Sequence, residues 1–289
     1  MKERKQPKPL LYTSLLGQSL LESYDMFADW LFILKNAVVD LGFFIIFAVI
    51  YTFYFNPKIV EVQSSLTTLM SQMSANIPSD SSMPTQEALI ALSSQKESFT
   101  QAFGRLAFLF FLLLIFIYAL WCIFQGTSWW LAHRKLRHNV GWYKSEQRFS
   151  ALSLIWAAIF LVLYIIIVKI SALLTVGSIE LVSVELLARM LGVALLIVLY
   201  FASISYSLLD IKLKEALKET FVIGIKKAAV AIPAFLLIII KFYVLYGLIM
   251  LLGLELVPKV VLGLIFFLPL TAWARLFMGV VVEKAPNKK

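Results

Sequence analysis

Cysteine is nearly absent from this 289-residue chain, because Cys122 is the only one. A single cysteine excludes an intrachain disulfide and a zinc site built from several thiolates. His133 and His138 are the only histidines, and five residues of separation place them on different faces of a helix. The motifs HExxH and GxSxG, the P-loop and the Rossmann glycine pattern are all missing. We therefore expect no metal site, no cofactor and no hydrolytic chemistry.

Charge is also scarce, at 15% of residues, while 61% are hydrophobic and the mean hydropathy is +0.88. Soluble domains carry about a quarter charged residues. The apolar residues come in blocks of about twenty, the length of helix that crosses about 30 Å of hydrocarbon. The composition predicts an all-α, polytopic membrane bundle, since lipid offers no hydrogen-bond partner to an unpaired backbone.

Six such blocks predict six transmembrane helices, at residues 37–55, 106–124, 151–170, 186–209, 228–251 and 260–282. The N-terminal stretch MKERKQPKPL is basic, but no short apolar core with a small-residue cleavage site follows it. A removable signal peptide is therefore not expected, and the first span is predicted to remain as an anchor.

Lysine and arginine are distributed unevenly among the connecting segments. Most of the 26 lie in the N-terminal segment, the linkers 125–150 and 210–227, and the C-terminal end. The positive-inside rule then predicts a protein of the cytoplasmic membrane with both termini in the cytoplasm. The net charge of +9 would lie against anionic lipid headgroups, so the bilayer is an expected partner and nucleic acid is not.

The spans and linkers predict an order of segments along the chain. These are a cytoplasmic amphipathic segment at 1–36, the first two spans at 37–124 with an outside helical hairpin at 56–105, a basic interfacial linker at 125–150, two spans at 151–209, an amphipathic cytoplasmic helix at 210–227, two spans at 228–282 and a cytoplasmic tail at 283–289. The hairpin has apolar residues at helical spacing on both sides of the turn IPSDSSMPTQ. It either caps the bundle or docks a protein partner.

A basic amphipathic stretch precedes the fifth span. Residues 205–238 include SLLDIKLKEALKETFVIGIKKAAVAIPAFLLI, in which a helix with one apolar face enters a span. This stretch resembles six-span prokaryotic membrane proteins of unassigned role that are related to the membrane domain of some glycerophosphodiesterases. The resemblance implies a six-span membrane module and carries no catalytic residue to this chain.

Lys241 is a single cation within the apolar fifth span, about 20 Å along the helix from Ala228. Tyr164 and Tyr51 are predicted at a similar depth, and either hydroxyl can pair with the ammonium group. Three interpretations stay open. The lysine snorkels toward the interface, lines a path for anions, protons or substrate, or forms a hydrogen bond between helices.

Two further polar groups sit near the inner ends of the first and last spans. Asp40 and Arg275 have similar predicted depths, so an ion pair between them would close the bundle. The fourth span carries a polar stripe suited to hydrogen bonds between helices, made of Tyr200, Ser203, Ser205, Tyr206 and Ser207.

Together these features favour a non-enzymatic membrane module that binds protein partners or lipids. The alternative is a small-solute or ion transporter or channel with Lys241 in a polar path. A lipid-modifying enzyme would instead need a polar cleft near Trp129, Trp130, His133 and Arg134.

Overall fold

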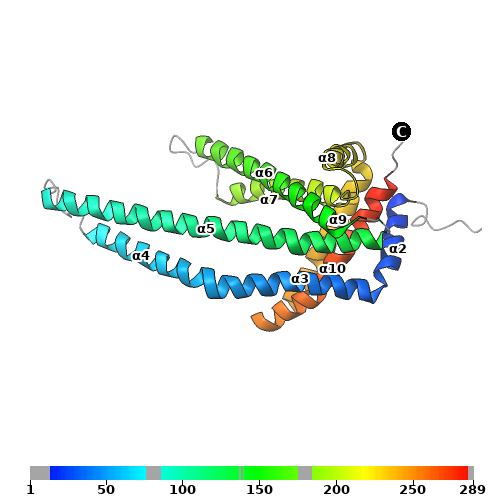
Figure 1. Cartoon of the computed structure of the whole chain (residues 1–289), viewed down its shortest axis with the longest axis horizontal. Helices are drawn as coiled ribbons and strands as arrows, with labels where there is room; N and C mark the ends of the chain where they lie inside the picture. Colours follow the sequence, from blue (N-terminus) through cyan, green and yellow to red (C-terminus); the bar gives the residue numbers. More distant parts are fainter. Residues whose placement is uncertain (1–13, 76–85, 137, 139, 175–183, 286–289) are drawn as a thin grey trace, which may run out of the picture. The chain divides into compact units, whose positions relative to one another are not determined.

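The computed structural model of the chain describes residues 14–75, 86–136, 138, 140–174 and 184–285. All regular elements within these ranges are helices (Figure 1). Six of the helical segments are long and apolar enough to cross a membrane. The predicted all-α membrane bundle is therefore confirmed, and the chain is a multi-pass membrane protein.

The helices follow one another with short connections. They are α2 (Leu15–Phe27), α3 (Trp30–Ile50), the π-helix η1 (Tyr51–Phe55), α4 (Asn56–Ala75), α5 (Gln86–Lys135), α6 (Trp142–Leu174), α7 (Val184–Tyr206), α8 (Leu213–Phe221), the π-helix η2 (Val222–Lys226), α9 (Ala228–Leu251) and α10 (Leu256–Lys284). The predicted fifth span coincides with α9, and the fourth ends three residues early, at Tyr206.

Several predicted boundaries differ from the observed ones. Residues from Trp30 onward belong to α3, so among residues 14–36, the described part of the segment 1–36, only α2 forms a separate helix. The 125–150 segment is mostly not a linker, because α5 continues to Lys135 and α6 begins at Trp142. Residues 210–227 are largely helical as predicted, in α8 and η2. The predicted turn of the 56–105 hairpin lies largely outside the described residues, and its role as cap or docking surface stays a prediction.

Local signals explain where the helices begin and end. The Ser14 hydroxyl accepts a hydrogen bond from the Gly17 amide at 3.0 Å and caps α2. The Asp29 carboxylate accepts from the Leu31 amide at 3.1 Å at the start of α3. Gly253 follows the end of α9 with a φ of 61°, a left-handed conformation that glycine adopts without strain.

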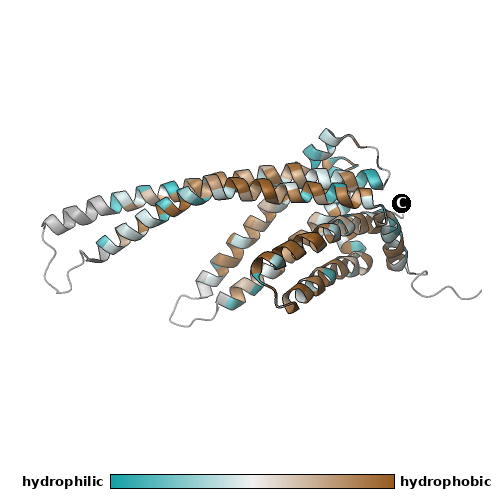
Figure 2. Cartoon of the chain, turned by 90° about the horizontal axis from the view of Figure 1, so that it is seen from below, coloured by the Kyte–Doolittle hydropathy of each residue, from teal (hydrophilic) through white to brown (hydrophobic). Residues whose placement is uncertain are grey.

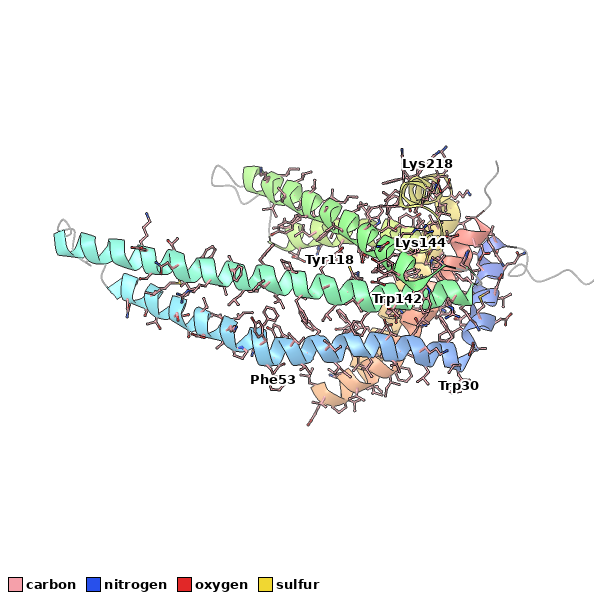
Figure 3. The ribbon with its side chains drawn as sticks, viewed as in Figure 1. Trp30, Phe53, Tyr118, Trp142, Lys144 and Lys218 are labelled. Atoms are coloured by element: carbon pink, nitrogen blue, oxygen red, sulfur yellow. The ribbon has the colours of Figure 1, made fainter. Side chains whose placement is uncertain are left out.

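The chain divides into two compact units. The second unit comprises residues 42–121, and the first comprises the remainder. Within the second unit, aromatic pairs join the α3–η1 helical segment to α5. The ring centroids of Phe55 and Phe116, for example, lie 5.9 Å apart. Phe53 points away from the ribbon and is 79% exposed (Figure 3). Hydrophobic residues dominate the middle of the long helices (Figure 2). Many of their side chains are exposed and suit contact with lipid.

In the first unit, α6 packs against α7, and α10 packs against both α2 and α9. Of the predicted polar stripe of the fourth span, Tyr200, Ser205 and Tyr206 form hydrogen bonds between elements, whereas the Ser203 and Ser207 hydroxyls donate to carbonyls of α7 itself. Trp156 of α6 donates its Nε1–H to the Ser205 hydroxyl at 2.8 Å. The Tyr200 hydroxyl donates to the Gly224 carbonyl of η2 at 2.9 Å. These bonds hold α7 against α6 and η2 within an otherwise apolar core.

Candidate functional site

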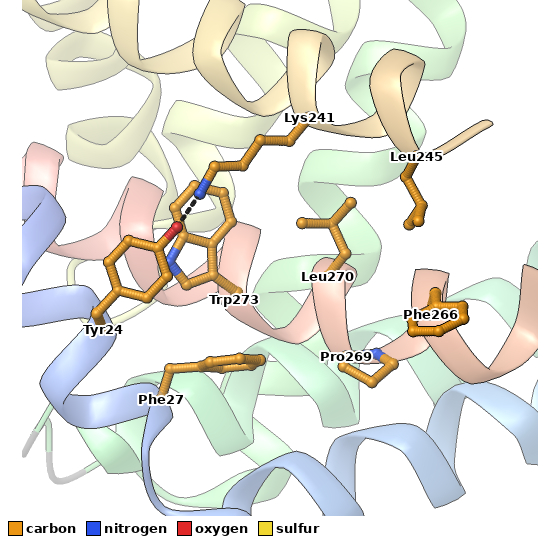
Figure 4. A pocket seen from close by; sticks show the side chains of 8 residues that line it. All are labelled: Tyr24, Phe27, Lys241, Leu245, Phe266, Pro269, Leu270 and Trp273. Carbon is orange, nitrogen blue, oxygen red and sulfur yellow. Dashed lines mark hydrogen bonds between the residues drawn. The ribbon is translucent and has the colours of Figure 1, made fainter. Parts of the chain in front are cut away.

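A pocket of about 360 Å³ opens between α2, α9 and α10 in the first unit. Most of its wall is apolar, and one cationic side chain enters it (Figure 4). The lining residues are Tyr24, Phe27, Lys241, Leu245, Phe266, Pro269, Leu270 and Trp273. The pocket thus combines a hydrophobic wall with a single charge, a combination typical of sites for amphiphilic ligands.

Lys241 extends into this pocket from α9 and has aromatic partners. Its ammonium nitrogen lies 3.5 Å from the ring centroid of Trp273 and 4.6 Å from that of Tyr24. The same nitrogen donates a hydrogen bond to the Tyr24 hydroxyl (Figure 4). The two rings stack with their centroids 5.6 Å apart, and Trp273 is almost fully buried. Cation–π contacts of this kind stabilise an ammonium group without neutralising its charge.

The predicted partners of Lys241 are different residues. Tyr164, on α6, is 44% exposed and does not line the pocket. Tyr51 belongs to η1 in the second unit, and the hydroxyl bonded to Lys241 is that of Tyr24. The structure therefore brings Lys241 together with Tyr24 and not with Tyr164. Tyr164 and Tyr51 were predicted because their positions along their spans place them at the same membrane depth as Lys241. Depth along a span does not indicate which helix packs beside α9.

A second polar site lies within the first unit, and its two charged residues are buried. Asp40 of α3 and Arg275 of α10 are 1% and 6% exposed. The guanidinium donates to both carboxylate oxygens, from Nη1 to Oδ2 and from Nη2 to Oδ1, each at 2.9 Å. The structure thus brings together the two residues of the predicted ion pair, in the bidentate geometry that makes arginine–carboxylate pairs strong.

Neutral side chains complete the hydrogen bonding around this pair. Arg275 Nη2 donates to Gln125 Oε1 at 2.6 Å, and the Ser128 hydroxyl donates to Asp40 Oδ1 at 2.9 Å. Thr271 Oγ1 lies 3.1 Å from Asp40 Oδ2. The cluster links α3, α5 and α10, and its charges balance. It therefore serves to hold helices together and offers no free charge to a ligand.

Comparison with known proteins gives no indication of function, so the function is inferred from the geometry of the sites. No family model, no curated protein and no solved structure matches this chain.

Sequence reasoning missed most partners in both clusters, although periodic signals mark some of them. Gln125 and Ser128 are three residues apart, and Thr271 precedes Arg275 by four, so each pair shares a helix face. Polar residues paired in this way inside apolar spans indicate a facing polar group. Trp273 gives no such signal, since an aromatic residue within a span is equally suited to lipid contact.

Chemically, the two sites differ in one respect. Asp40 and Arg275 neutralise each other, whereas Lys241 forms no ion pair with any carboxylate among the described residues. The Lys241 pocket is therefore the site at which an anionic ligand would gain most, and it is the candidate functional site.

Proposed function

We propose that this protein is a membrane module that binds an anionic amphiphilic lipid in the pocket between α2, α9 and α10. The acidic head group would pair with Lys241, and the hydrocarbon chain would lie along the apolar wall near Phe266 and Leu270. Between the two broad possibilities of a protein partner and a lipid, the amphiphilic pocket favours the lipid. Both termini would lie in the cytoplasm, as the distribution of lysine and arginine predicts.

One observation carries the proposal: the Lys241 ammonium points into an apolar pocket and is held there by neutral partners. An ionised lysine within a span costs about 2.5–3.5 kcal/mol on insertion scales, so its retention suggests a role. A carboxylate or phosphate oxygen would neutralise the charge while keeping the cation–π contact with Trp273. The Tyr24 hydroxyl is adjacent and can donate a second hydrogen bond to the same anion.

The wall of the pocket argues against the alternative of a channel. A path for ions requires polar groups or water along its length. Apart from Lys241 and Tyr24, the pocket is lined by hydrophobic side chains and by the weakly polar indole of the buried Trp273. A hydrocarbon chain fits this lining, and a hydrated ion does not.

Quenching of tryptophan fluorescence by brominated lipid tests the proposal, because bromine quenches on contact and Trp273 forms part of the pocket wall. The protein in nonionic micelles is titrated with brominated phosphatidylglycerol or with brominated phosphatidylcholine of the same chains. Either lipid quenches the exposed tryptophans, such as Trp30 and Trp121, so the readout is the part of the quenching that is lost in Trp273→Phe. We expect this part to be saturable and to be produced by the anionic lipid alone. Lys241→Gln should weaken the affinity about 10- to 100-fold, the loss of one charged hydrogen bond.

Lys169→Gln provides the matched control, because Lys169 is an exposed lysine near the C-terminal end of α6, away from the pocket. It should bind the anionic lipid like the unmodified protein. Equal Trp273-dependent quenching by both lipids, or equal losses in the two lysine variants, would show that the pocket does not select an anion. Displacement of the lipid by inorganic phosphate would instead assign the site to a small free anion. An ion flux in proteoliposomes that Lys241→Gln abolishes would favour the channel.

A further inference from the structure

The only two histidines of the chain meet where α5 ends. His133 lies in the last turn of α5, and His138 lies in the connection to α6. The expectation of different helix faces assumed one continuous helix, but His138 lies beyond the end of α5. Its amide donates to the His133 carbonyl at 3.0 Å and folds the chain back. Their rings lie 5.3 Å apart, and Asp210, from the connection between α7 and α8, joins them.

Hydrogen bonding fixes the tautomer of His133. Its Nε2 lies 2.9 Å from the Tyr206 carbonyl oxygen at the C-terminal end of α7. A carbonyl oxygen only accepts, so Nε2 carries the hydrogen and Nδ1 keeps its lone pair. The side chain is 2% exposed, and Nδ1 has no hydrogen-bond partner among the described residues. Histidines that bind metals show this arrangement, with one ring nitrogen donating to a carbonyl and the other free to coordinate.

The spacing of the three residues fits one metal ion. A ligand atom of His133, one of His138 and one of Asp210 all lie within 4.8 Å of one another. His138 Nδ1 is 3.5 Å from Asp210 Oδ2, longer than a good charge-assisted hydrogen bond. Two ligands of a tetrahedral zinc ion, with bonds of about 2.0–2.1 Å, lie about 3.4 Å apart. The separation of His138 Nδ1 and Asp210 Oδ2 therefore matches two neighbouring ligands on one ion, and the His133 ligand atom lies within 4.8 Å of both.

A polar pocket of about 240 Å³ adjoins the cluster and includes His138, Asp210, Ser207, Glu219 and Glu283 in its wall. This pocket gives the ion a route of entry and space for a water ligand in a fourth position.

We propose that His133, through Nδ1, His138 and Asp210 bind one divalent transition-metal ion of the zinc class. Two imidazoles and a carboxylate form a donor set that zinc and similar ions favour. The bound ion would join the α5–α6 connection to the α7–α8 connection. This proposal does not depend on the lipid site, which lies between other helices.

Metal titration of the full chain, purified with a tag that lacks histidine and treated with chelator, tests the proposal. Calorimetry should show one Zn²⁺ bound per chain, and Zn²⁺ should raise the thermal midpoint. Co²⁺ should give visible d–d absorption without thiolate charge transfer, because no cysteine is in the cluster. His138→Ala and Asp210→Asn should each weaken Zn²⁺ binding by about 100-fold or more. Loss of a residue that only hydrogen-bonds to a metal ligand weakens binding by about 10- to 100-fold.

Glu283→Gln serves as the matched control, since it removes a carboxylate of the same pocket from outside the cluster. It should keep the metal affinity, and so should Lys241→Gln. His133→Ala also removes the bond to the Tyr206 carbonyl, so the test uses the other two ligands, whose loss leaves that bond intact. Absence of Zn²⁺ binding would overturn the proposal. So would unchanged binding in His138→Ala and Asp210→Asn, or an equal loss in Glu283→Gln.

Discussion

Replacing Asp40 by asparagine probes the buried cluster with almost no change in shape. The Asp40 carboxylate accepts from four donor groups: two from Arg275 and one each from Gln125 and Ser128. In Asp40→Asn the amide nitrogen takes the place of one oxygen. Either orientation of the amide then sets its N–H groups against a guanidinium nitrogen, so no flip of the amide restores the network.

The expected loss in the free energy of unfolding follows from the burial of the Asp40–Arg275 pair. Asp40→Asn leaves the Arg275 guanidinium, whose side chain is 7% exposed, without its counter-charge. Removing one partner of a buried ion pair costs about 3–5 kcal/mol. The Gln125 acceptor at 2.6 Å from Nη2 remains and offsets part of this cost. The double variant Asp40→Asn/Arg275→Gln removes both charges, so it should lose about 1–3 kcal/mol less than the sum of the single variants.

The assay is the free energy of unfolding in nonionic micelles titrated with dodecyl sulfate. Glu185→Gln is the control, because it breaks the ion pair with Arg189, whose atoms are 2.6 Å apart but whose side chains are 73% and 74% exposed. Such an exposed pair contributes about 0.5 kcal/mol or less. If Asp40→Asn costs no more than Glu185→Gln, or if the single effects simply add, the buried pair does not hold the helices together.

Two further perturbations follow from particular contacts. A Cβ at Gly224 would lie 2.5 Å from the Phe201 ring, so Gly224→Ala should cost about 1–3 kcal/mol in the same unfolding assay, whereas Gly192→Ala, with no atom within 4 Å, should cost nothing. Asp29, outside the spans, has a pKa held below its ordinary value of 3.8, chiefly by the hydrogen bond from Lys135. Its contribution to stability is complete above that value and is lost as the pH falls through the lowered pKa, so the thermal midpoints of the protein and of Asp29→Asn should converge in acid. A constant difference between the two midpoints across this pH range would contradict the pairing with Lys135.

The positions of the apolar blocks were predictable, whereas their limits as helices were less so. Residues 228–251 coincide with α9, because a continuous apolar stretch has one stable backbone conformation in lipid. The continuation of α5 to Lys135 was missed, since basic and aromatic residues suit a helix end and an interfacial linker equally.

What the sequence determined by itself is the class of protein: an α-helical chain with six segments able to cross a membrane, and a few polar groups within them. Composition and periodicity suffice for this, because each span satisfies its backbone within its own helix. Only the tertiary structure decided which polar groups meet. Lys241 lies against Tyr24 rather than Tyr164, and His138 folds back over His133, because helix packing and one tight turn set these contacts. The spacing of residues along the chain predicts neither the Lys241–Tyr24 contact nor the His133–His138 contact.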